Sequence, residues 1–431
     1  MENWTRRSFL AASAASYSRI LGANDRLRLG MVGCGGISKA DLHMFMLNPE
    51  VDCTMVCDVD ETRLADGVTR VEAARSHRPE AVKDFRRIID NKDVDVVLVC
   101  TPDHWHALPT VFACQAGKDV YCEKPLAPTI AEGRAMLEAA KRHNRIVQMG
   151  TQWHSGRHYQ EAAEFVQSGR LGKIRLVRAW AYLDWVGGIG NKPDSEPPAG
   201  VDYDMWLGPT PKRPFNPNRF HFNFRWFWSY AGGLMTDWGV HLLNVALWAM
   251  GPEPPLSVTS TGGKYVLTDD TETPDTQLTV YEFPTYSLIW EHQVLGGVGI
   301  GARPHGLSFS GSEATLILDA DGWEVIPEPK KKEIRAYKRL VDPNDPYRDG
   351  RRAHVRNFLD CVRSRQAPVE NLEVGHFVST VSHLGNLALR TGAKIVWDAK
   401  QERVTNDAKA DALVLREYRK PWSLPYMARI A

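Results

Sequence analysis

Short apolar runs alternate with mixed stretches through the first 150 residues. Continuous apolar runs typical of buried strands occur in RLRLGMV, CTMVCDVD, VDVVLVCTP, KDVYCEKP and RIVQMGTQ. The stretches between them include ADLHMFML, HALPTVFACQAG and TIAEGRAMLEAAKRHN, which we interpret as helices. Strands that alternate with helices predict a doubly wound, mostly parallel sheet, and ligands of such sheets bind beyond the carboxyl ends of the strands.

The pattern changes after Lys173. KIRLVRAWAYL alternates like a half-buried strand, and further strands are expected in PLSVTSTGGKY, TQLTVYEF, YSLIWEHQV and GLSFSGSEATLILD. These runs suit an open, mostly antiparallel sheet with hairpin connections. PKKKEIRAYKR indicates a solvated edge, and RRAHVRNFLDCVRSR and LEVGHFVSTVSHLGNLALR predict two helices that pack back on the body. We therefore expect a second α/β domain.

Residues 184–231 form a long segment rich in proline, glycine and aromatic residues. Segments of this length in a compact domain are usually functional or disordered, and the aromatic content of this one argues against disorder. The following stretch, DWGVHLLNVALWAMG, has the apolar spacing of an amphipathic helix. Asp237 and His241 lie four positions apart there, which would place a carboxylate and an imidazole on one helix face.

Composition indicates a globular protein of two domains. The chain has 431 residues, of which 43% are apolar and 24% charged. With 53 basic and 52 acidic side chains, nucleic acid is not an expected partner. No apolar run approaches the roughly 18 residues of a membrane helix, so insertion in a membrane is not expected. Cysteines within apolar runs, such as Cys57 and Cys122, predict buried free thiols.

The N-terminus has the layout of a twin-arginine export signal. TRRSFLAASAAS places Arg6 and Arg7 before Phe9, Leu10 and small apolar residues, and no acid follows until Asp25. This pattern predicts a signal over residues 1–24 and a periplasmic or otherwise exported protein. The alternative is a basic N-terminus on a cytoplasmic protein. The expected organisation is then a signal over residues 1–24, a first domain over 25–150 and a second domain over 151–431.

A glycine turn follows the first strand, in GCGGIS. Gly33 and Gly35 allow a tight turn and a close approach by a pyrophosphate, which would meet the N-terminus of the next helix. Asp58 ends the second strand 20 residues after Ser38, where a carboxylate can accept hydrogen bonds from the adenosine ribose. A carboxylate there would repel a 2′-phosphate. The sequence therefore predicts NAD as the cofactor, in preference to NADP.

GCGGIS, CDVD, TPDHWHA and CEKP, in this order, together with GGLMTDWGVHLLN, resemble the Gfo/Idh/MocA oxidoreductase family. The resemblance runs from about Arg26 to the end of the chain. It implies a Rossmann domain followed by an α/β domain with an open, largely antiparallel sheet. By the same resemblance Lys124, Asp237 and His241 are the catalytic residues, and Pro125 follows a cis peptide bond. Asn244 departs from the family pattern, in which many members have an aspartate.

The resemblance also implies a set of cofactor-binding positions. They are Gly33, Gly35, Gly36, Ile37, Asp58, Thr101, Asp103, His106, Glu123 and Lys124. In the expected chemistry a hydroxyl loses its proton while hydride leaves the carbon. His241 would act as the general base, Asp237 would orient the imidazole or the substrate hydroxyl, and Lys124 would stabilise developing alkoxide charge.

Tryptophan content points to a carbohydrate substrate. Eight of the 14 tryptophans lie between Trp153 and Trp248, and indole faces stack well on sugar rings. The expected walls of the crevice are Trp185, Trp206, Trp226 and Trp228; the alternative places them in the core or an oligomer interface. Gln152, His154 and Arg178 are the expected hydroxyl-binding side chains. His104 with His106, or His154 with His158, lacks the recognised spacing of a metal site, so no metal is expected.

These features together predict an exported, NAD-dependent oxidoreductase of sugars, polyols or glycosides, assembled as a homo-oligomer. Free NAD should be scarce outside the cytoplasm, so the cofactor should stay bound and be regenerated in place. One scheme oxidises one sugar and reduces another. Another cleaves a glycoside through a transient 3-keto intermediate, with no net redox change. The remaining alternatives are a non-catalytic sugar-binding protein and a cytoplasmic dehydrogenase.

Overall fold

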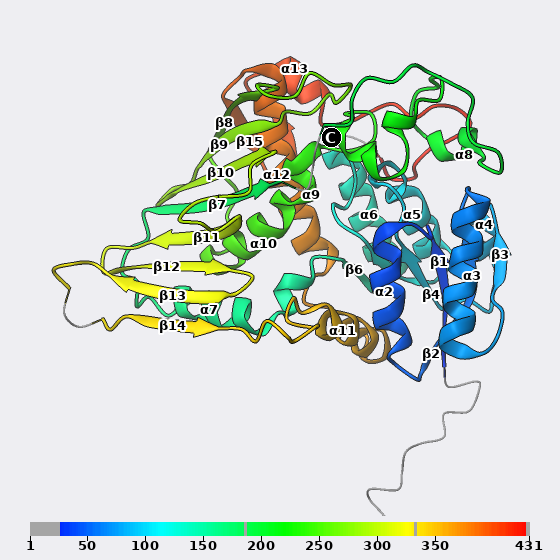
Figure 1. Ribbon diagram of the computed structural model, residues 1–431, viewed down its shortest axis with the longest axis horizontal. Helices are drawn as coiled ribbons and strands as arrows, with labels where there is room; N and C mark the ends of the chain where they lie inside the picture. Colours follow the sequence, from blue (N-terminus) through cyan, green and yellow to red (C-terminus); the bar gives the residue numbers. More distant parts are fainter. Residues whose placement is uncertain (1–25, 185–187, 332–333, 428–431) are drawn as a thin grey trace, which may run out of the picture.

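The computed structural model describes residues 26–184, 188–331 and 334–427. The proposed export signal and Trp185 lie outside the described residues. Two sheets organise the remainder, with one sheet in each half of the chain (Figure 1). No helix of the described part is long and apolar enough to cross a membrane.

The first sheet has six strands, all parallel, in the order β3-β2-β1-β4-β5-β6. The strands are β1 (Leu27–Val32), β2 (Val51–Cys57), β3 (Glu80–Val82), β4 (Val96–Val99), β5 (Asp119–Cys122) and β6 (Val147–Met149). Five of them are the apolar runs that the sequence predicts. β3 was not predicted, because its three residues are partly exposed and carry no apolar run.

Helices cover both faces of this sheet (Figure 1). They are α2 (Gly36–Met46), α3 (Glu61–Arg75), α4 (Arg86–Asp90), α5 (Ala107–Gln115) and α6 (Ile130–His143). One further helix, α11 (Arg351–Ser364), comes from the second half of the sequence. Its Phe358 is fully buried and meets Phe45 of α2 and Tyr121 of β5 edge-on, at centroid distances of 6.0 and 5.7 Å. By its packing α11 therefore belongs to the nucleotide-binding half.

The second sheet has ten strands in the order β14-β13-β12-β11-β7-β10-β9-β8-β15-β16. Its strands are β7 (Leu176–Leu183), β8 (Ser257–Gly263), β9 (Thr276–Glu282), β10 (Ser287–Val294), β11 (His305–Ser310), β12 (Ala314–Asp319), β13 (Gly322–Pro327), β14 (Tyr337–Leu340), β15 (Ile395–Asp398) and β16 (Arg403–Val404). The β7–β10 pair is parallel and the other pairs are antiparallel. The predicted fold class, a Rossmann domain joined to a mostly antiparallel α/β domain, is confirmed.

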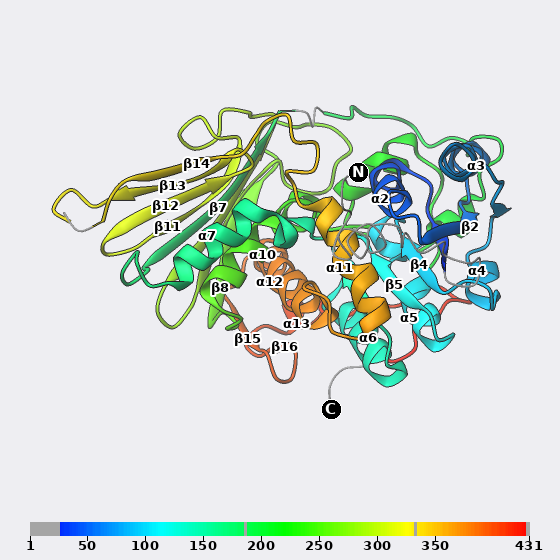
Figure 2. The same ribbon diagram turned by 90° about the horizontal axis from the view of Figure 1, so that it is seen from below.

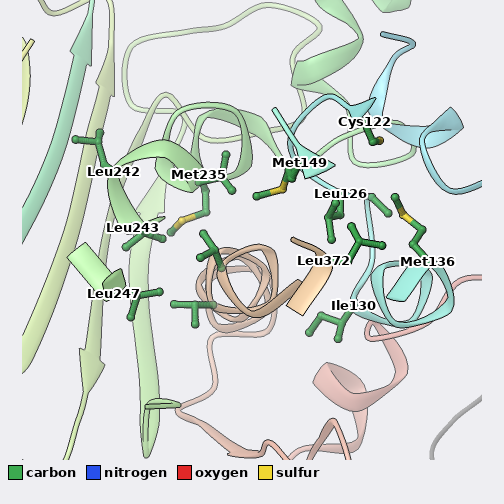
Figure 3. Packing of buried hydrophobic residues seen from close by; sticks show 14 of the residues in the cluster. Cys122, Leu126, Ile130, Met136, Met149, Met235, Leu242, Leu243, Leu247 and Leu372 are labelled. Carbon is green, nitrogen blue, oxygen red and sulfur yellow. The ribbon is translucent and has the colours of Figure 1, made fainter. Parts of the chain in front are cut away.

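Three long helices lie against one face of the second sheet (Figure 2). They are α7 (Arg157–Gln167), α10 (Gly239–Met250) and α12 (Leu372–Thr391). Figure 3 shows α12 between Met235 and Leu243 on one side and Leu126 and Ile130 on the other, so one apolar core joins the two halves. Such a shared core resists relative movement of the halves, because interiors are close-packed.

The stretch predicted as one amphipathic helix differs from the prediction in two ways. It is divided at Trp238 into α9 (Gly233–Asp237) and α10, so Asp237 ends one helix and His241 lies in the first turn of the next. Its residues are buried on nearly every side, since α7, α12 and the sheet surround it. Apolar spacing alone does not reveal such complete burial.

Residues 188–231 leave the second sheet and cross the nucleotide-binding half, where they form α8 (Tyr203–Leu207), η4 (Pro217–Arg219) and η5 (His221–Trp226). We call this segment the strap. Its Asp202 N–H donates to the Val59 carbonyl at 2.9 Å, and its Gly200 carbonyl accepts from the Glu61 N–H at 3.2 Å. His221 Nε2 lies 2.8 Å from Asp60 Oδ2. The strap is therefore fixed to the turn that follows β2.

All seven cysteines are free and buried, as the sequence predicts. Burial raises the pKa of Cys53 and Cys114 to about 12, which keeps both thiols protonated.

Candidate active site

The glycine turn after β1 has the backbone shape that a bound pyrophosphate needs. Gly33 has φ +92°, and a Cβ there would lie 2.6 Å from the carbonyl oxygen of Cys100. Only glycine fits this position without strain. Gly36 begins α2, and a Cβ on it would meet nothing within 4 Å. The open space at the start of this 11-residue helix fits a phosphate, which the helix N-terminus would stabilise.

Asp58 holds the shape of the same pocket. Its Oδ2 accepts from the Cys34 N–H at 2.8 Å, and its Oδ1 accepts from the Asp60 N–H at 3.0 Å. Burial raises the pKa of Asp58. Arg63, which the sequence analysis missed, places its guanidinium where a Cβ on Gly35 would collide with it. A carboxylate for ribose hydroxyls and a cation beside the glycine turn both fit a dinucleotide.

The pocket is closed by residues from both halves of the chain. Its lining consists of Val32, Gly33, Gly35, Cys57, Asp58, Val59, Arg63, Lys83, Phe85, Cys100, Thr101, Pro102, Trp105, Met205, Trp206 and His221. The last three come from the strap. Trp206 was expected to wall the sugar crevice, but the structure places it at the nucleotide pocket. Sequence patterns could not show this, because the strap reaches the pocket through tertiary contacts alone.

The remaining predicted cofactor positions differ in their surroundings. Thr101 lines the pocket, and its Oγ1 is buried with no partner in the described chain. Ile37 is 36% exposed on α2. His106 is buried, and its Nδ1 and Nε2 lie 2.7 and 2.9 Å from the Pro125 and Thr101 carbonyl oxygens. His106 thus connects the backbone segments that follow β4 and β5, and both of its ring nitrogens face backbone carbonyl groups. Glu123 is buried beside them.

Lys124 and Asp237 meet across the two halves. The Lys124 Nζ donates to Asp237 Oδ1 at 2.7 Å and to the Asp237 carbonyl oxygen at 2.9 Å. Both side chains are largely buried, with 14% and 13% of their surface exposed. The Lys124–Pro125 peptide bond is cis, as the resemblance implies. The pair joins the carboxyl end of β5 to the end of α9, beside the nucleotide pocket.

His241 completes this group. Burial and the nearby Lys124 charge hold the pKa of His241 well below its usual range, so its imidazole is neutral at pH 7. Its ring packs against Trp153 at a centroid distance of 5.0 Å, and its Nδ1 is buried with no partner among the residues described. The Asp237 carboxylate bonds to Lys124 and not to the imidazole. The expectation that Asp237 orients the imidazole therefore has no hydrogen bond to support it.

Two further ionisable residues lie close to Asp237. Arg225, in η5 of the strap, places its Nε 3.3 Å from Asp237 Oδ2. Asp103, in η2 (Asp103–Trp105), is buried close by, and burial together with the Asp237 charge raises the pKa of Asp103 to about 8. The sequence analysis anticipated Asp103 and missed Arg225. Only the position of Arg225 next to the expected wall residue Trp226 could have drawn attention to it.

The predicted substrate-binding residues Gln152 and His154 turn into the protein. The amide orientation of Gln152 that satisfies both neighbours has its nitrogen donating to the Gly150 carbonyl and its oxygen accepting from Arg351, each at 3.0 Å. His154 Nδ1 lies 2.6 Å from the buried Glu370, which also accepts from Asn244 Nδ2 at 2.6 Å. Asn244, the departure from the family pattern, therefore helps to hold a buried carboxylate.

Arg178 and Trp226 are not placed to contact a substrate. Arg178 lies on β7 between Val177 and Ala179, which pack under the helices, so its side chain points to the opposite face of the sheet. There it lies 3.8 Å from Glu291. Trp226 is 3% exposed and belongs to the core. Trp228 lines a separate cavity, where the Arg390 guanidinium lies 4.8 Å from its ring centroid. Burial and strand direction, which override local patterns, explain these differences.

The described residues contain no group of three or more His, Cys, Asp or Glu side chains that could hold a metal ion. His104 Nε2 instead lies 2.9 Å from the Trp206 carbonyl oxygen, and burial lowers the pKa of His158 to about 4.

Comparisons with known proteins agree with this geometry. Residues 27–151 match a family model described as an oxidoreductase family with an NAD-binding Rossmann fold. Residues 165–260 and 332–424 match the model of the same family's C-terminal alpha/beta domain.

Individual relatives are distant. Myo-inositol 2-dehydrogenase of Thermotoga maritima is 22% identical, over 84% of this chain and 96% of the relative. The uncharacterized oxidoreductase YrbE of Bacillus subtilis is 24% identical over 52% of this chain, and the match spans about half (54%) of that relative. A levoglucosan dehydrogenase solved in complex with NADH and levoglucosan has a TM-score of 0.66 at 19% identity, covering 86% of this chain and 99% of that one. Together with the two domain matches and the Lys124–Asp237 contact, these findings show that the chain belongs to the Gfo/Idh/MocA oxidoreductase family.

Proposed function

We propose that this protein oxidises a CH–OH group of a sugar or polyol with an NAD that stays bound and is regenerated in place. The observation that carries the proposal is the Lys124–Asp237 hydrogen bond, which brings an amine, a carboxylate and the neighbouring His241 together near Asp103, the residue that follows Thr101 and Pro102 of the nucleotide pocket. The sugar or polyol class is supported by relatives named as inositol and levoglucosan dehydrogenases.

Each catalytic side chain has a role that its environment permits. His241 is neutral, so its imidazole can accept the proton of the reacting hydroxyl. The Lys124 ammonium has two of its three N–H groups bonded to Asp237, and by turning towards the reacting oxygen it can donate to that atom and stabilise alkoxide charge. The two neighbouring cations lower the pKa of Asp237 well below its usual range, which keeps it ionised. Bound NAD would supply the hydride acceptor.

The strap supports retention of the cofactor. It contributes Met205, Trp206 and His221 to the pocket lining and is fastened to the turn after β2. From outside, Arg419 of the C-terminal tail donates to the Gly208 carbonyl at 3.1 Å. A dinucleotide held under a segment fixed at two places should dissociate slowly, because the strap has to detach first.

A redox-neutral reaction uses the same groups. Oxidation of a glycoside to a ketone acidifies the adjacent C–H, and the neutral imidazole of His241 can act as the acceptor of that proton. Elimination of the aglycone, addition of water and re-reduction would follow. Glycoside cleavage is the second candidate function for this reason.

The test uses the protein as purified. We expect denaturation to release close to one dinucleotide per chain. Addition of myo-inositol, levoglucosan or glucose without added NAD should then produce the absorbance of reduced nicotinamide for at least one of them. Release of nitrophenol from nitrophenyl glycosides without lasting reduction would favour the redox-neutral reaction. Protein that neither carries nor binds NAD would contradict the proposal.

We also propose that the protein is exported by the twin-arginine route and forms a homo-oligomer. Seven buried free thiols suit a chain that folds in a reducing cytoplasm before export. The sheet face opposite α7, α10 and α12 carries exposed apolar residues, among them Ile326 at 48% and Leu278 at 39%, which suits a subunit contact. Cell fractionation of the wild type and an R6K/R7K variant tests export, and light scattering tests assembly. Retention of the wild type in the cytoplasm or a monomeric mass would refute the respective proposal.

A further inference from the structure

We propose that Arg225 is a positioning residue for the reaction: it holds the Asp237 carboxylate in place while the Lys124 amine turns from that carboxylate to the reacting oxygen of the sugar. This inference rests on the proposed function. It assigns a catalytic purpose to the strap in addition to the covering of the nucleotide pocket.

The geometry places Asp237 between two cations on opposite oxygens. Lys124 Nζ bonds to Oδ1 at 2.7 Å, and Arg225 Nε lies 3.3 Å from Oδ2. The side chains of Arg225 and Asp237 are 17% and 13% exposed, so solvent screens the contact weakly. The carboxylate thus has a second ionic partner that does not depend on Lys124.

Arg225 itself is held by its own segment. Its Nη1 donates to the Phe222 carbonyl at 2.7 Å, and its guanidinium lies over the Phe222 and Phe224 rings at 4.0 and 5.3 Å. A planar guanidinium fixed in this way keeps its charge at one place beside Asp237, which a flexible lysine side chain would not. The short helix η5 therefore fixes the position of this charge.

The arrangement solves a difficulty in the proposed reaction. In the structure, the Lys124 amine donates two hydrogen bonds to Asp237. When the amine turns to donate to the reacting oxygen, at least one of these two bonds is weakened. A buried carboxylate that loses its sole cation is strongly unfavourable. With Arg225 on the other oxygen, Asp237 remains paired while Lys124 turns.

The charges around Asp237 determine its pKa. Four charged or titratable groups face the Asp237 carboxylate: Arg225 from the strap, Lys124 from the end of β5, His241 from α10 and Asp103 from η2. Burial favours the protonated carboxyl, whereas Arg225 makes the largest contribution that lowers the pKa of Asp237, ahead of Lys124. Loss of the Arg225 charge should therefore raise the pKa of Asp237.

The test compares R225Q, which removes the charge, with R225K, which retains it. The matched control is R219Q, because Arg219 joins two parts of the same strap through its 2.9 Å contact with Asp194 and makes no hydrogen bond or ion pair with the catalytic residues in the described part of the chain. For each protein kcat and KM are measured from pH 2.5 to 9 on the substrate identified with the wild type, because the pKa of Asp237 lies well below the usual range of a carboxyl group. Bound NAD and the melting temperature are measured in parallel.

We expect R225Q to lose about 10- to 100-fold in kcat with less than a threefold change in KM, the size of effect usual for a residue that orients a catalytic group. The acid limb of its kcat/KM profile should move up by about one pH unit, while R225K and R219Q keep the wild-type acid limb. A lower melting temperature or NAD content in R225Q with an unmoved acid limb would contradict the inference, since that is the behaviour of a mere anchor.

If R225Q fails to fold, the measurements on R225K alone test the inference. A folded R225K with the wild-type acid limb and a kcat within tenfold supports the inference, and a shift of a full unit contradicts it, because the charge has been kept. Failure of the proposed function is distinguishable, since the wild type would then show no reduction of bound NAD by any sugar.

Discussion

At the scale of single residues, the site is defined by which groups carry charge at pH 7. Asp237 is ionised between Lys124 and Arg225, whereas His241 is neutral because it is buried beside a lysine. Asp103 keeps its proton up to about pH 8, since burial and the Asp237 charge oppose its ionisation. One acid is thus held ionised and the other held neutral within one small group, the kind of separation that acid–base chemistry uses.

Asp103 should make stability depend on pH. Its pKa is raised to about 8 in the folded protein and lies near 3.8 otherwise, so the folded state holds an extra proton between these values. As the pH rises through that interval, the free energy of unfolding should therefore fall by roughly 1.4 kcal/mol per pH unit because of this group. D103N removes this dependence, and urea unfolding at pH 5, 6 and 7 at equal NAD content measures it.

The exposed Asp93, with 81% of its side chain accessible, offers the control variant D93N. If the free energy of unfolding of D103N depends on pH as steeply as that of the wild type, Asp103 does not hold the extra proton. The same conclusion follows if D93N loses as much of this pH dependence as D103N does.

At the scale of elements, α11 connects the second half of the sequence to the nucleotide-binding half. Phe358 fills the space between Phe45 and Tyr121, and Arg351 donates to the fully buried Asp41 of α2 at 2.7 Å. The Arg365 guanidinium also bonds to Asp119 at the start of β5, at 2.6 Å. The helix thus covers one face of the first sheet and neutralises its buried carboxylates.

Removal of the Phe358 ring should destabilise the whole protein. F358A deletes a fully buried aromatic side chain, so a loss of about 3–5 kcal/mol in the free energy of unfolding is expected. Y265A is the matched control, because Tyr265 is 70% exposed and its loss should cost less than about 0.5 kcal/mol. Denaturant unfolding checks both. Equal stability of F358A and wild type would mean that α11 is not part of this core.

The sequence predicted elements with strong local signals and missed those that depend on tertiary contacts. Five parallel strands, the glycine turn and Lys124, Asp237 and His241 followed from apolar runs and family motifs. The division at Trp238 and the outward direction of Arg178 did not, because each depends on what packs around the element. Arg63 and Arg225 were missed because the sequence does not show that one lies beside the glycine turn and the other beside Asp237.

At the scale of the whole molecule, the two halves share one core and one site. The strap crosses from the second sheet to the turn after β2, and α12 packs between the two halves (Figure 3). The pocket for NAD consequently contains residues from both halves, and so does the catalytic group. Cofactor retention and catalysis therefore depend on the same interdomain contacts.

His221 should govern how slowly NAD leaves. Its Nε2 contacts Asp60 Oδ2 at 2.8 Å, and burial lowers its pKa to about 4, so a neutral imidazole makes this contact at pH 7. H221Q should release NAD about tenfold faster, the effect of losing about 1.4 kcal/mol of contact with a charged group. K212Q changes an exposed strap residue and should leave the rate at the wild-type value. Both rates are measured by loading the protein with NADH, displacing it with excess NAD and following the change in NADH fluorescence. Equal rates in the wild type and both variants would show that His221 does not control release.

The central claim is that Lys124 and His241 act together on one reacting CH–OH group. A double-mutant cycle of K124M and H241N, followed by single-turnover reduction of bound NAD by the substrate, tests it most directly. Each single variant should lose about 10²- to 10⁴-fold in rate, and the double variant should lose scarcely more than the slower single, because residues that act as a unit are not additive. Losses that multiply in the double variant, or a single variant with the wild-type rate, would contradict the claim.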